Sequence, residues 1–383
     1  MLHIYSGPTL SARETLRAAP HAQVHPPVRH GDLFSSDIRS GDTVLLIDGV
    51  YHQNPALRHK EILDALARGV HVAGASSIGA MRAAELDDFG MSGYGAIYHD
   101  YRSGAIDGDD EVAVAHRDAG DRRTRTVALI NLRYTLAPAV TRGLLSESTA
   151  NRAIERARRI YYPLRTLTAL IQDFTAAGLN DAVFVLSGCN GLVDQKKADA
   201  LGAIRALIAE ETTSVELDVP DTAFLRDWRN AIRYAGELQR VRYQQLFKPA
   251  FVDVWPSVRD RLVRAHATTS MLSDLADRER ARIFRPRFDL GDQTTLAMLL
   301  QNEREEDRVR AARLVAATKT FREQQPRWRA TVLHDHVAKG LLTEMWGTAA
   351  FDEGALERGF RYPREALDAF NTFAVGYVLE GQR

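Results

Sequence analysis

Short hydrophobic runs alternate with helix-like stretches in the first half of the chain. The runs at residues 2–6, 43–48 and 70–75 are β-like, and each is followed by a turn and a stretch with helical spacing. A further run at residues 182–187 is predicted to be a later strand. Alternation of this kind is typical of parallel strands joined by helical crossovers, with helices on both faces. The pattern therefore predicts an α/β fold with a mainly parallel, Rossmann-like sheet.

From about residue 150 the pattern becomes helical. Residues 151–177 and 194–211 carry apolar positions at spacings of three and four, and the chain beyond residue 221 reads as helices separated by Pro, Gly and Asp. A chain of 383 residues is long enough for two cores, since single cores stop growing at about 250–300 residues. We therefore predict an α/β core domain at residues 1–210 and an all-helical C-terminal domain at residues 211–383.

Small and polar residues follow all three of the β-like runs near the N-terminus: Gly7, Pro8, Thr9, Asp48, Ser76 and Ser77. Ligands of open α/β sheets bind at the carboxyl ends of the strands. These turns are therefore expected to converge on one edge of the sheet and to form a cleft there.

The third of these turns opens a helix of small residues, in the segment GASSIGAMRAAEL at residues 74–86. A serine before a helix can cap its first N–H groups, hold an anion there or present a nucleophile. A serine nucleophile needs a base or a preorganised oxyanion site, and Gly79 allows a substrate to come close. The segment resembles a strand–serine–helix elbow without the G-x-S-x-G sequence. Capping and catalysis both stay open.

A helix predicted to begin at Pro55, with Asn54 as its cap, carries His59 and Lys60. His59 falls on the apolar face, where a buried core histidine and a catalytic one are both possible. Lys60 is either the surface partner of Asp64 or a base or cation that acts beside the serines.

Several charged residues need partners. Asp48 is the acidic partner expected for His59 or Lys60, while Arg82 and Glu85 stand among small apolar residues, where a buried charge is costly unless it is paired.

The acidic stretch at residues 107–111 lacks the spacing of an EF-hand loop and reads as an acidic first helical turn. Within it, either Asp110 or Glu111 is expected to close the site or to pair with Arg82. Arg133 is expected either to bind a carboxylate with two hydrogen bonds or to lie on the surface.

The N-terminal part of the chain resembles the TfuA family. The resemblance spans residues 1–205 and is carried by ordered motifs: YSGPTL at 5–10, PPV at 26–28, GDL at 31–33, IDG at 47–49, HKEIL at 59–63, the segment at 74–86, FGM at 89–91 and DEVA at 110–113. Met81 stands where the family usually has Leu, and Ser76 where it often has Ala. Ser77 occupies the position of the family's fixed serine.

The resemblance implies an accessory enzyme that works beside a YcaO enzyme in converting peptide backbone amides to thioamides. Such a protein would hydrolyse the Gly thiocarboxylate of a ubiquitin-like sulfur carrier, release sulfide to the YcaO partner and help it engage the precursor peptide. The residues implied in catalysis are Ser77, Lys60, His59, Asp48 and Arg82. Those implied in substrate binding are Gly7, Pro8, Thr9, Ser76, Gly79, Glu85, Glu111 and Arg133. The alternative is a non-catalytic adaptor that binds the YcaO enzyme and its peptide.

The composition of the chain limits the classes of partner and cofactor that we expect. Lys and Arg together number 50, as do Asp and Glu, so no long-range attraction to nucleic acid or to a membrane surface is expected. No apolar run reaches 18 residues and the N-terminus does not resemble a signal peptide, which predicts a cytoplasmic protein. The single cysteine, Cys189, and scattered histidines predict no metal site, and the absence of Walker and G-x-G-x-x-G motifs predicts no nucleotide cofactor.

Overall fold

The structure is a computed structural model in which two compact units are distinguished, Met1–Pro220 and Asp221–Arg383. It describes residues 1–381 except for 51–54, 116–125, 189–190, 210–216, 221, 268–292, 326–332 and 361. Asn54 and Cys189, which the sequence analysis names, lie outside the described residues.

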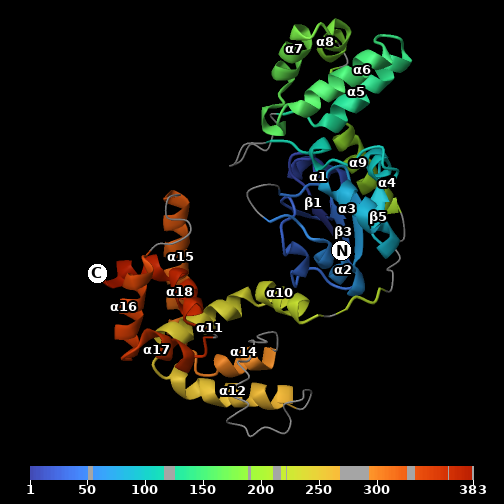
Figure 1. Ribbon diagram of the computed structural model, residues 1–383. Helices are drawn as coiled ribbons and strands as arrows, with labels where there is room; N and C mark the ends of the chain where they lie inside the picture. Colours follow the sequence, from blue (N-terminus) through green and yellow to red (C-terminus); the bar gives the residue numbers. More distant parts are fainter. Residues whose placement is uncertain are drawn as a thin grey trace. The chain divides into compact units, whose positions relative to one another are not determined.

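Five parallel strands form the sheet of the N-terminal unit (Figure 1). They are β1 (Leu2–Tyr5), β2 (Gln23–His25), β3 (Thr43–Leu46), β4 (His71–Ala75) and β5 (Ser92–Tyr94), in the order β2-β1-β3-β4-β5. The predicted parallel sheet is thereby confirmed. The strand order changes direction between β1 and β3, and the carboxyl ends of strands at such a switch point are where open α/β sheets bind their ligands.

One face of the sheet is covered by α1 (Ala12–Ala18) and α9 (Gln195–Ala209). Alternate strand residues such as Ile4 and Leu45 pack there against apolar residues of α9, among them Ile204. Because side chains alternate between the faces of a strand, the neighbouring positions point to the other side.

The opposite face is covered by α2 (His59–Ala67) and α3 (Ile78–Leu86). Strand residues including Leu46 and Val72 pack there against Ile62 of α2 and the apolar residues of α3. The sheet is therefore the middle layer of three, as the alternating pattern predicts.

Helix α2 begins four residues later than predicted. Residues 55–58 are not helical, and Arg58 is the cap residue of α2. The cause is Glu61, whose buried carboxylate accepts hydrogen bonds from the backbone N–H of Arg58 (3.0 Å) and of Gly31 (2.6 Å). A glutamate at the third helical position can fix the start of a helix in this way. Burial raises the pKa of Glu61 to about 7.

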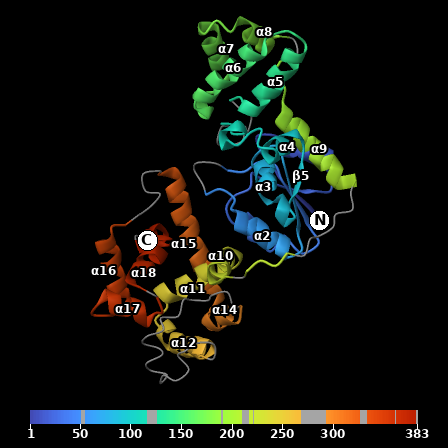
Figure 2. The same ribbon diagram turned by 45° about the vertical axis from the view of Figure 1, so that its right-hand side comes forward.

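The chain from residue 96 onward forms helices only, among the residues that the structure describes. Helix α4 (Ala96–Arg102) packs against α3 and α9, and α5 (Leu129–Thr141), α6 (Glu147–Arg159), α7 (Leu167–Ala176) and α8 (Asn180–Ser187) share a core of their own (Figure 2). Short 3-10 turns lie at Asp32–Phe34, Asp87–Phe89, Asp109–Glu111 and Tyr162–Leu164.

The strand predicted at residues 182–187 is wrong, because this segment lies in α8. Ala182 and Leu186, four residues apart, are its buried positions, while Phe184 between them is 67% exposed. That spacing is helical, and a short apolar run does not distinguish a strand from a helix by itself. The sequence analysis also missed β2 and β5, which have three residues each.

Helices are the only regular elements among the described residues of the C-terminal unit, as predicted. Its helices are α10 (Ala223–Arg233), α11 (Ala235–Phe247), α12 (Phe251–Ala267), α14 (Gln293–Leu299), α15 (Glu305–Gln324), α16 (Asp335–Trp346), α17 (Phe351–Glu357), α18 (Pro363–Asn371) and α19 (Ala374–Gly381). Aromatic residues such as Phe247 and Phe370 gather in one of its two hydrophobic clusters. No described helix of either unit is long and apolar enough to cross a lipid bilayer.

Candidate functional site

Asp48 organises the loop that follows β1. Its carboxylate is 2% exposed and accepts hydrogen bonds from the backbone N–H groups of Gly7 and Thr9, both 2.9 Å, and from the Thr9 hydroxyl at 2.7 Å. Asp48 and this loop lie at the switch point between β3 and β1. The expectation that Asp48 pairs with His59 or Lys60 is wrong, because the carboxylate is engaged by the loop.

The turn after β4 carries the two serines in unusual conformations. Ser76 has a φ of 71° and is the one non-glycine residue with positive φ in the described part of the chain. Its side chain is fully buried, and its hydroxyl has no hydrogen-bond partner among the described residues. A left-handed non-glycine residue costs about 1–3 kcal/mol, and such residues cluster at functional sites.

Ser77 precedes α3 without capping it. Its side chain makes no cap hydrogen bond, and its backbone N–H donates to the carbonyl of Ala75 at 2.8 Å. Ser77 is 9% exposed, so it is the more accessible of the two serines. An ordinary capping serine does not account for this turn.

Gly79 brings the start of α3 directly onto the end of β3. Its N–H lies 3.4 Å from the carbonyl of Ile47, and a Cβ at this position would lie 1.8 Å from the carbonyl of Leu46. The missing side chain thus serves close helix–strand packing. The same contact brings the serine turn next to the strand end that precedes Asp48.

His59, Arg82 and Glu85 form a partly exposed cluster between α2 and α3. The Glu85 carboxylate lies 2.7 Å from Nε2 of His59 and 2.5 Å from Nη1 of Arg82. The prediction that His59 lies on a buried face is wrong: because α2 begins at His59, its side chain projects from the first turn and is 47% exposed.

Lys60 is exposed and makes no ion pair with any residue that the structure describes. The predicted pair with Asp64 is wrong, since the buried Asp64 carboxylate accepts a 2.8 Å hydrogen bond from Arg68. The grouping of Lys60 with Gly7, Asp48 and Ser77 around one cleft stays a prediction.

Glu111 is the centre of a second buried ion cluster. It is 1% exposed and accepts two hydrogen bonds from Arg133, at 2.9 and 2.7 Å, and one from Arg158 at 3.0 Å. The hydrogen bonds to Glu111 raise the pKa of Arg133. Arg133 therefore does bind a carboxylate with two bonds, but the carboxylate belongs to the protein. The expected pairing of Asp110 or Glu111 with Arg82 is wrong, because Asp110 pairs with Arg165 and Arg82 pairs with Glu85.

Lys196, in the first turn of α9, is a buried cation, although its sequence context, residues 194–197, reads as the charged N-terminus of a helix. Its side chain is 3% exposed, and its Nζ donates a 2.7 Å hydrogen bond to the carbonyl of Val112. Burial lowers the pKa of Lys196, whereas the negative charges of Asp48 and Asp194 partly oppose this shift.

Lys196 lines a cavity of about 170 Å³, which is room for several water molecules. The other lining residues are Pro8, Thr9, Val114, Thr126, Val127, Ala128, Asn131, Leu192 and Asp194. Asn131 fixes the start of α9, because its amide donates to Asp194 and accepts from the backbone N–H of Lys196, both at 3.2 Å. The cavity thus lies beside the loop that Asp48 holds.

The spacing of apolar residues in α9 could have predicted that Lys196 is buried. Lys196, Ala200, Ala203 and Leu207 are all buried and recur at intervals of three and four. A lysine in register with the apolar face of a helix is a buried cation, and such cations are rare unless they are paired.

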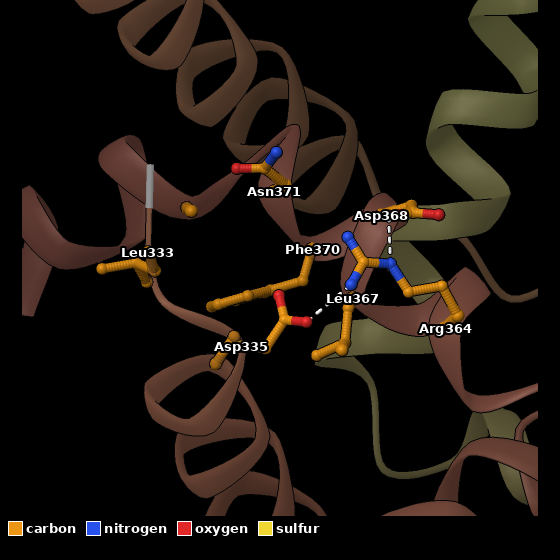
Figure 3. A pocket seen from close by; sticks show the side chains of 9 residues that line it. Leu333, Asp335, Arg364, Leu367, Asp368, Phe370 and Asn371 are labelled. Atoms are coloured by element: carbon orange, nitrogen blue, oxygen red, sulfur yellow. Dashed lines mark hydrogen bonds and ion pairs between the residues drawn. The ribbon is translucent and has the colours of Figure 1, made fainter. Parts of the chain in front are cut away.

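A pocket in the C-terminal unit is a poorer candidate (Figure 3). Its volume is about 20 Å³, room for one water molecule. Arg364 at its rim already bonds to Asp335 at 2.6 Å and to Asp368 at 3.0 Å. Its charged groups therefore satisfy one another.

Comparison with models of protein families matches residues 48–166 to the TfuA-like proteins. This segment is TfuA-like. The resemblance to the TfuA family that the sequence motifs indicate is thereby confirmed for residues 48–166. The TfuA-like segment contains Asp48, the serine turn and the clusters of Glu85 and Glu111, whereas Lys196 lies beyond it. No protein with a curated description matches the chain.

A metal centre is not formed by the residues that the structure describes. Among them, no group of three His, Cys, Asp or Glu side chains is arranged to hold an ion. That the protein acts without a metal stays a prediction.

Proposed function

We propose that the protein is an accessory enzyme for peptide backbone thioamidation, which acts in the cytoplasm beside a YcaO enzyme. It hydrolyses the C-terminal thiocarboxylate of a ubiquitin-like sulfur carrier and releases sulfide to that partner. The observation that carries the proposal is the turn at Ser76 and Ser77, with its left-handed backbone and a buried hydroxyl without a partner. The TfuA-like segment that contains this turn supports the thioamidation role.

Ser77 is the proposed nucleophile. Its oxygen attacks the thiocarboxylate carbonyl, the C–S bond breaks, and the serine proton leaves on sulfur as HS⁻. Water then cleaves the acyl-serine ester to give the carrier carboxylate, a proton and free serine. No oxidant or reductant is needed, since the carbon keeps its oxidation state.

Ser76 supplies a donor for the charge that develops on the carbonyl oxygen. An unpaired buried hydroxyl is a cost to the folded state, and it is recovered when an oxyanion accepts its hydrogen bond. Among the cations implied from the sequence, Arg133 is occupied by Glu111. Arg82 bonds to Glu85 through Nη1 alone, and its Nε has no described partner. Arg82 and Lys60 are therefore the cations proposed to attract the thiocarboxylate anion to the site.

The test is sulfide release by the purified full chain from a thiocarboxylated carrier that ends in Gly. Sulfide is measured directly, and loss of sulfur from the carrier is followed by mass spectrometry. The proposal expects turnover by the wild-type chain well above the carrier alone. If the purified chain leaves the thiocarboxylate intact, the hydrolase proposal is wrong.

An adaptor without catalysis is the second proposal. Tyr161, Leu164 and Phe184 in the helical group after β5 are 56%, 65% and 67% exposed, and exposed large hydrophobic residues are typical of binding surfaces. As an adaptor, the chain would stimulate thioamidation of the precursor peptide by the YcaO enzyme even when free sulfide is supplied, and Ser77→Ala would stimulate it equally.

A further inference from the structure

The buried ammonium of Lys196 has less negative charge around it than a buried cation requires. Two carboxylates influence it, but Asp48 is held by Gly7 and Thr9, and Asp194 accepts from Asn131 and the backbone N–H of Lys197. No carboxylate oxygen of a described residue lies within 4.0 Å of Nζ. A buried charge is costly unless it is paired and hydrogen-bonded.

Nζ also has N–H donors that no described residue accepts. An ammonium group carries three N–H donors, and one of them is used by the carbonyl of Val112. The cavity of about 170 Å³ that Lys196 lines is the space available to a further acceptor.

We propose that this cavity binds the carboxylate-type terminus of a narrow peptide tail, with the Lys196 ammonium as its anion contact. The inference rests on the proposed function and deepens it, because the tail it describes is the Gly-terminated end of the sulfur carrier. The remaining described lining joins polar groups with apolar side chains. The hydroxyls of Thr9 and Thr126 each make one hydrogen bond within the protein and keep capacity for a second, and Asp194 is engaged by Asn131.

The cavity is linked to the serine turn through a chain of contacts. Thr9 of its lining donates to Asp48 at 2.7 Å, and Asp48 directly follows Ile47, whose carbonyl lies 3.4 Å from the N–H of Gly79. Gly79 is two residues from Ser77. A tail anchored at Lys196 is therefore held at the same edge of the sheet as the proposed nucleophile.

The chain offers a matched control for Lys196. The next residue, Lys197, is 41% exposed and forms an ion pair of 2.5 Å with Glu14. Lys196→Met and Lys197→Met therefore remove the same charge one residue apart, inside and outside the cavity. Both variants are compared with the wild-type chain by melting temperature before use.

Binding is measured by calorimetry on the full chain with three probes: glycylglycine, its C-terminal amide and acetate. We expect glycylglycine to bind the wild type, the amide not to bind, and acetate to bind at least ten-fold more weakly. Lys196→Met should weaken glycylglycine binding ten- to hundred-fold, the usual effect of losing a hydrogen bond to a charged group. Lys197→Met should bind as the wild type does.

Three results would overturn the inference: equal binding of acid and amide, equal binding by Lys196→Met and wild type, or acetate binding as tightly as glycylglycine. The last would make the cavity a site for free small carboxylates.

Kinetics separate this inference from the proposed function. With the thiocarboxylated carrier, Lys196→Met should raise KM at least ten-fold and change kcat less. If the wild type binds glycylglycine through Lys196 but releases no sulfide, the hydrolase proposal fails and the carboxylate site stands. If sulfide release and KM are unchanged in Lys196→Met, the site fails and the hydrolase proposal stands.

Hydrogen exchange on the wild type gives a result even if Lys196→Met does not fold. Glycylglycine should slow amide exchange in peptides that cover residues 5–10 and 193–200, and leave those of α15 unchanged. Unchanged exchange in both cavity peptides at saturating glycylglycine would overturn the inference.

Discussion

Two sites at the carboxyl edge of the same sheet treat their polar groups in opposite ways. In the turns after β1 and β3, the Asp48 carboxylate is buried but accepts three hydrogen bonds. In the turn after β4, the Ser76 hydroxyl is also buried, yet it bonds to nothing described, and its backbone is left-handed. The hydrogen bonds of Asp48 stabilise the folded chain. The unpaired hydroxyl and the left-handed backbone of Ser76 lower its stability.

The difference indicates that the Asp48 site and the serine turn have different roles. A satisfied buried carboxylate fixes the position of a loop, while an unsatisfied group in a strained backbone is kept where a ligand can use it. Substitutions on the Asp48 side should therefore act mainly on stability, and substitutions on the serine side mainly on turnover.

Ser77→Ala should have the largest effect. As the proposed nucleophile, its loss should lower sulfide release by about 10³-fold or more with a nearly unchanged melting temperature. Ser11 is the matched control, because its hydroxyl caps α1 by accepting from the backbone N–H of Glu14. Ser11→Ala should cost about 0.5–2 kcal/mol of stability and leave turnover unchanged.

Retention of most activity by Ser77→Ala would contradict the covalent mechanism. Attack by water on a thiocarboxylate attracted to the site by Lys60 and Arg82 would then be the better account.

Asp48→Ala should have the second largest effect, on stability. It leaves the N–H groups of Gly7 and Thr9 and the Thr9 hydroxyl without their acceptor, so we expect a loss of about 3–5 kcal/mol in the free energy of unfolding, measured with denaturant. Asp37→Ala, at an exposed position of the same unit, should stay within about 0.5 kcal/mol. If Asp48→Ala lowered the free energy of unfolding by less than about 1 kcal/mol, the proposed contrast between the Asp48 site and the serine turn would be wrong.

The sheet was largely readable from the sequence, because the hydrophobic runs of β1, β3 and β4 are bounded by turns and followed by helical spacing. β2 and β5, with three residues each, are too short to give a period, and neighbouring strands define them. In α8 the local apolar run suggested a strand, but packing against other helices decides its structure.

Only part of the candidate site could be predicted from the sequence. Parallel strands bring their carboxyl ends to one edge, so the meeting of Gly7 and Asp48 follows from chain order alone. Pairings such as Glu111 with Arg133 and Arg158, or His59 with Glu85, depend on which helix faces meet. No local spacing encodes those partners.

Ser76→Gly should have the smallest effect, and its sign is the sharpest test of the comparison. Glycine adopts a positive φ without strain and removes the unpaired hydroxyl, which together outweigh its extra backbone entropy of about 0.5–1 kcal/mol. We therefore expect the free energy of unfolding to rise by about 1–2 kcal/mol while sulfide release falls. Ser103→Gly is the control, since Ser103 is exposed and has an ordinary helical backbone with a φ of −81°, so the entropy cost of glycine should lower the stability. If Ser76→Gly were also destabilising, the turn would not be strained. The contrast between Ser76 and the fully hydrogen-bonded Asp48 would then be wrong.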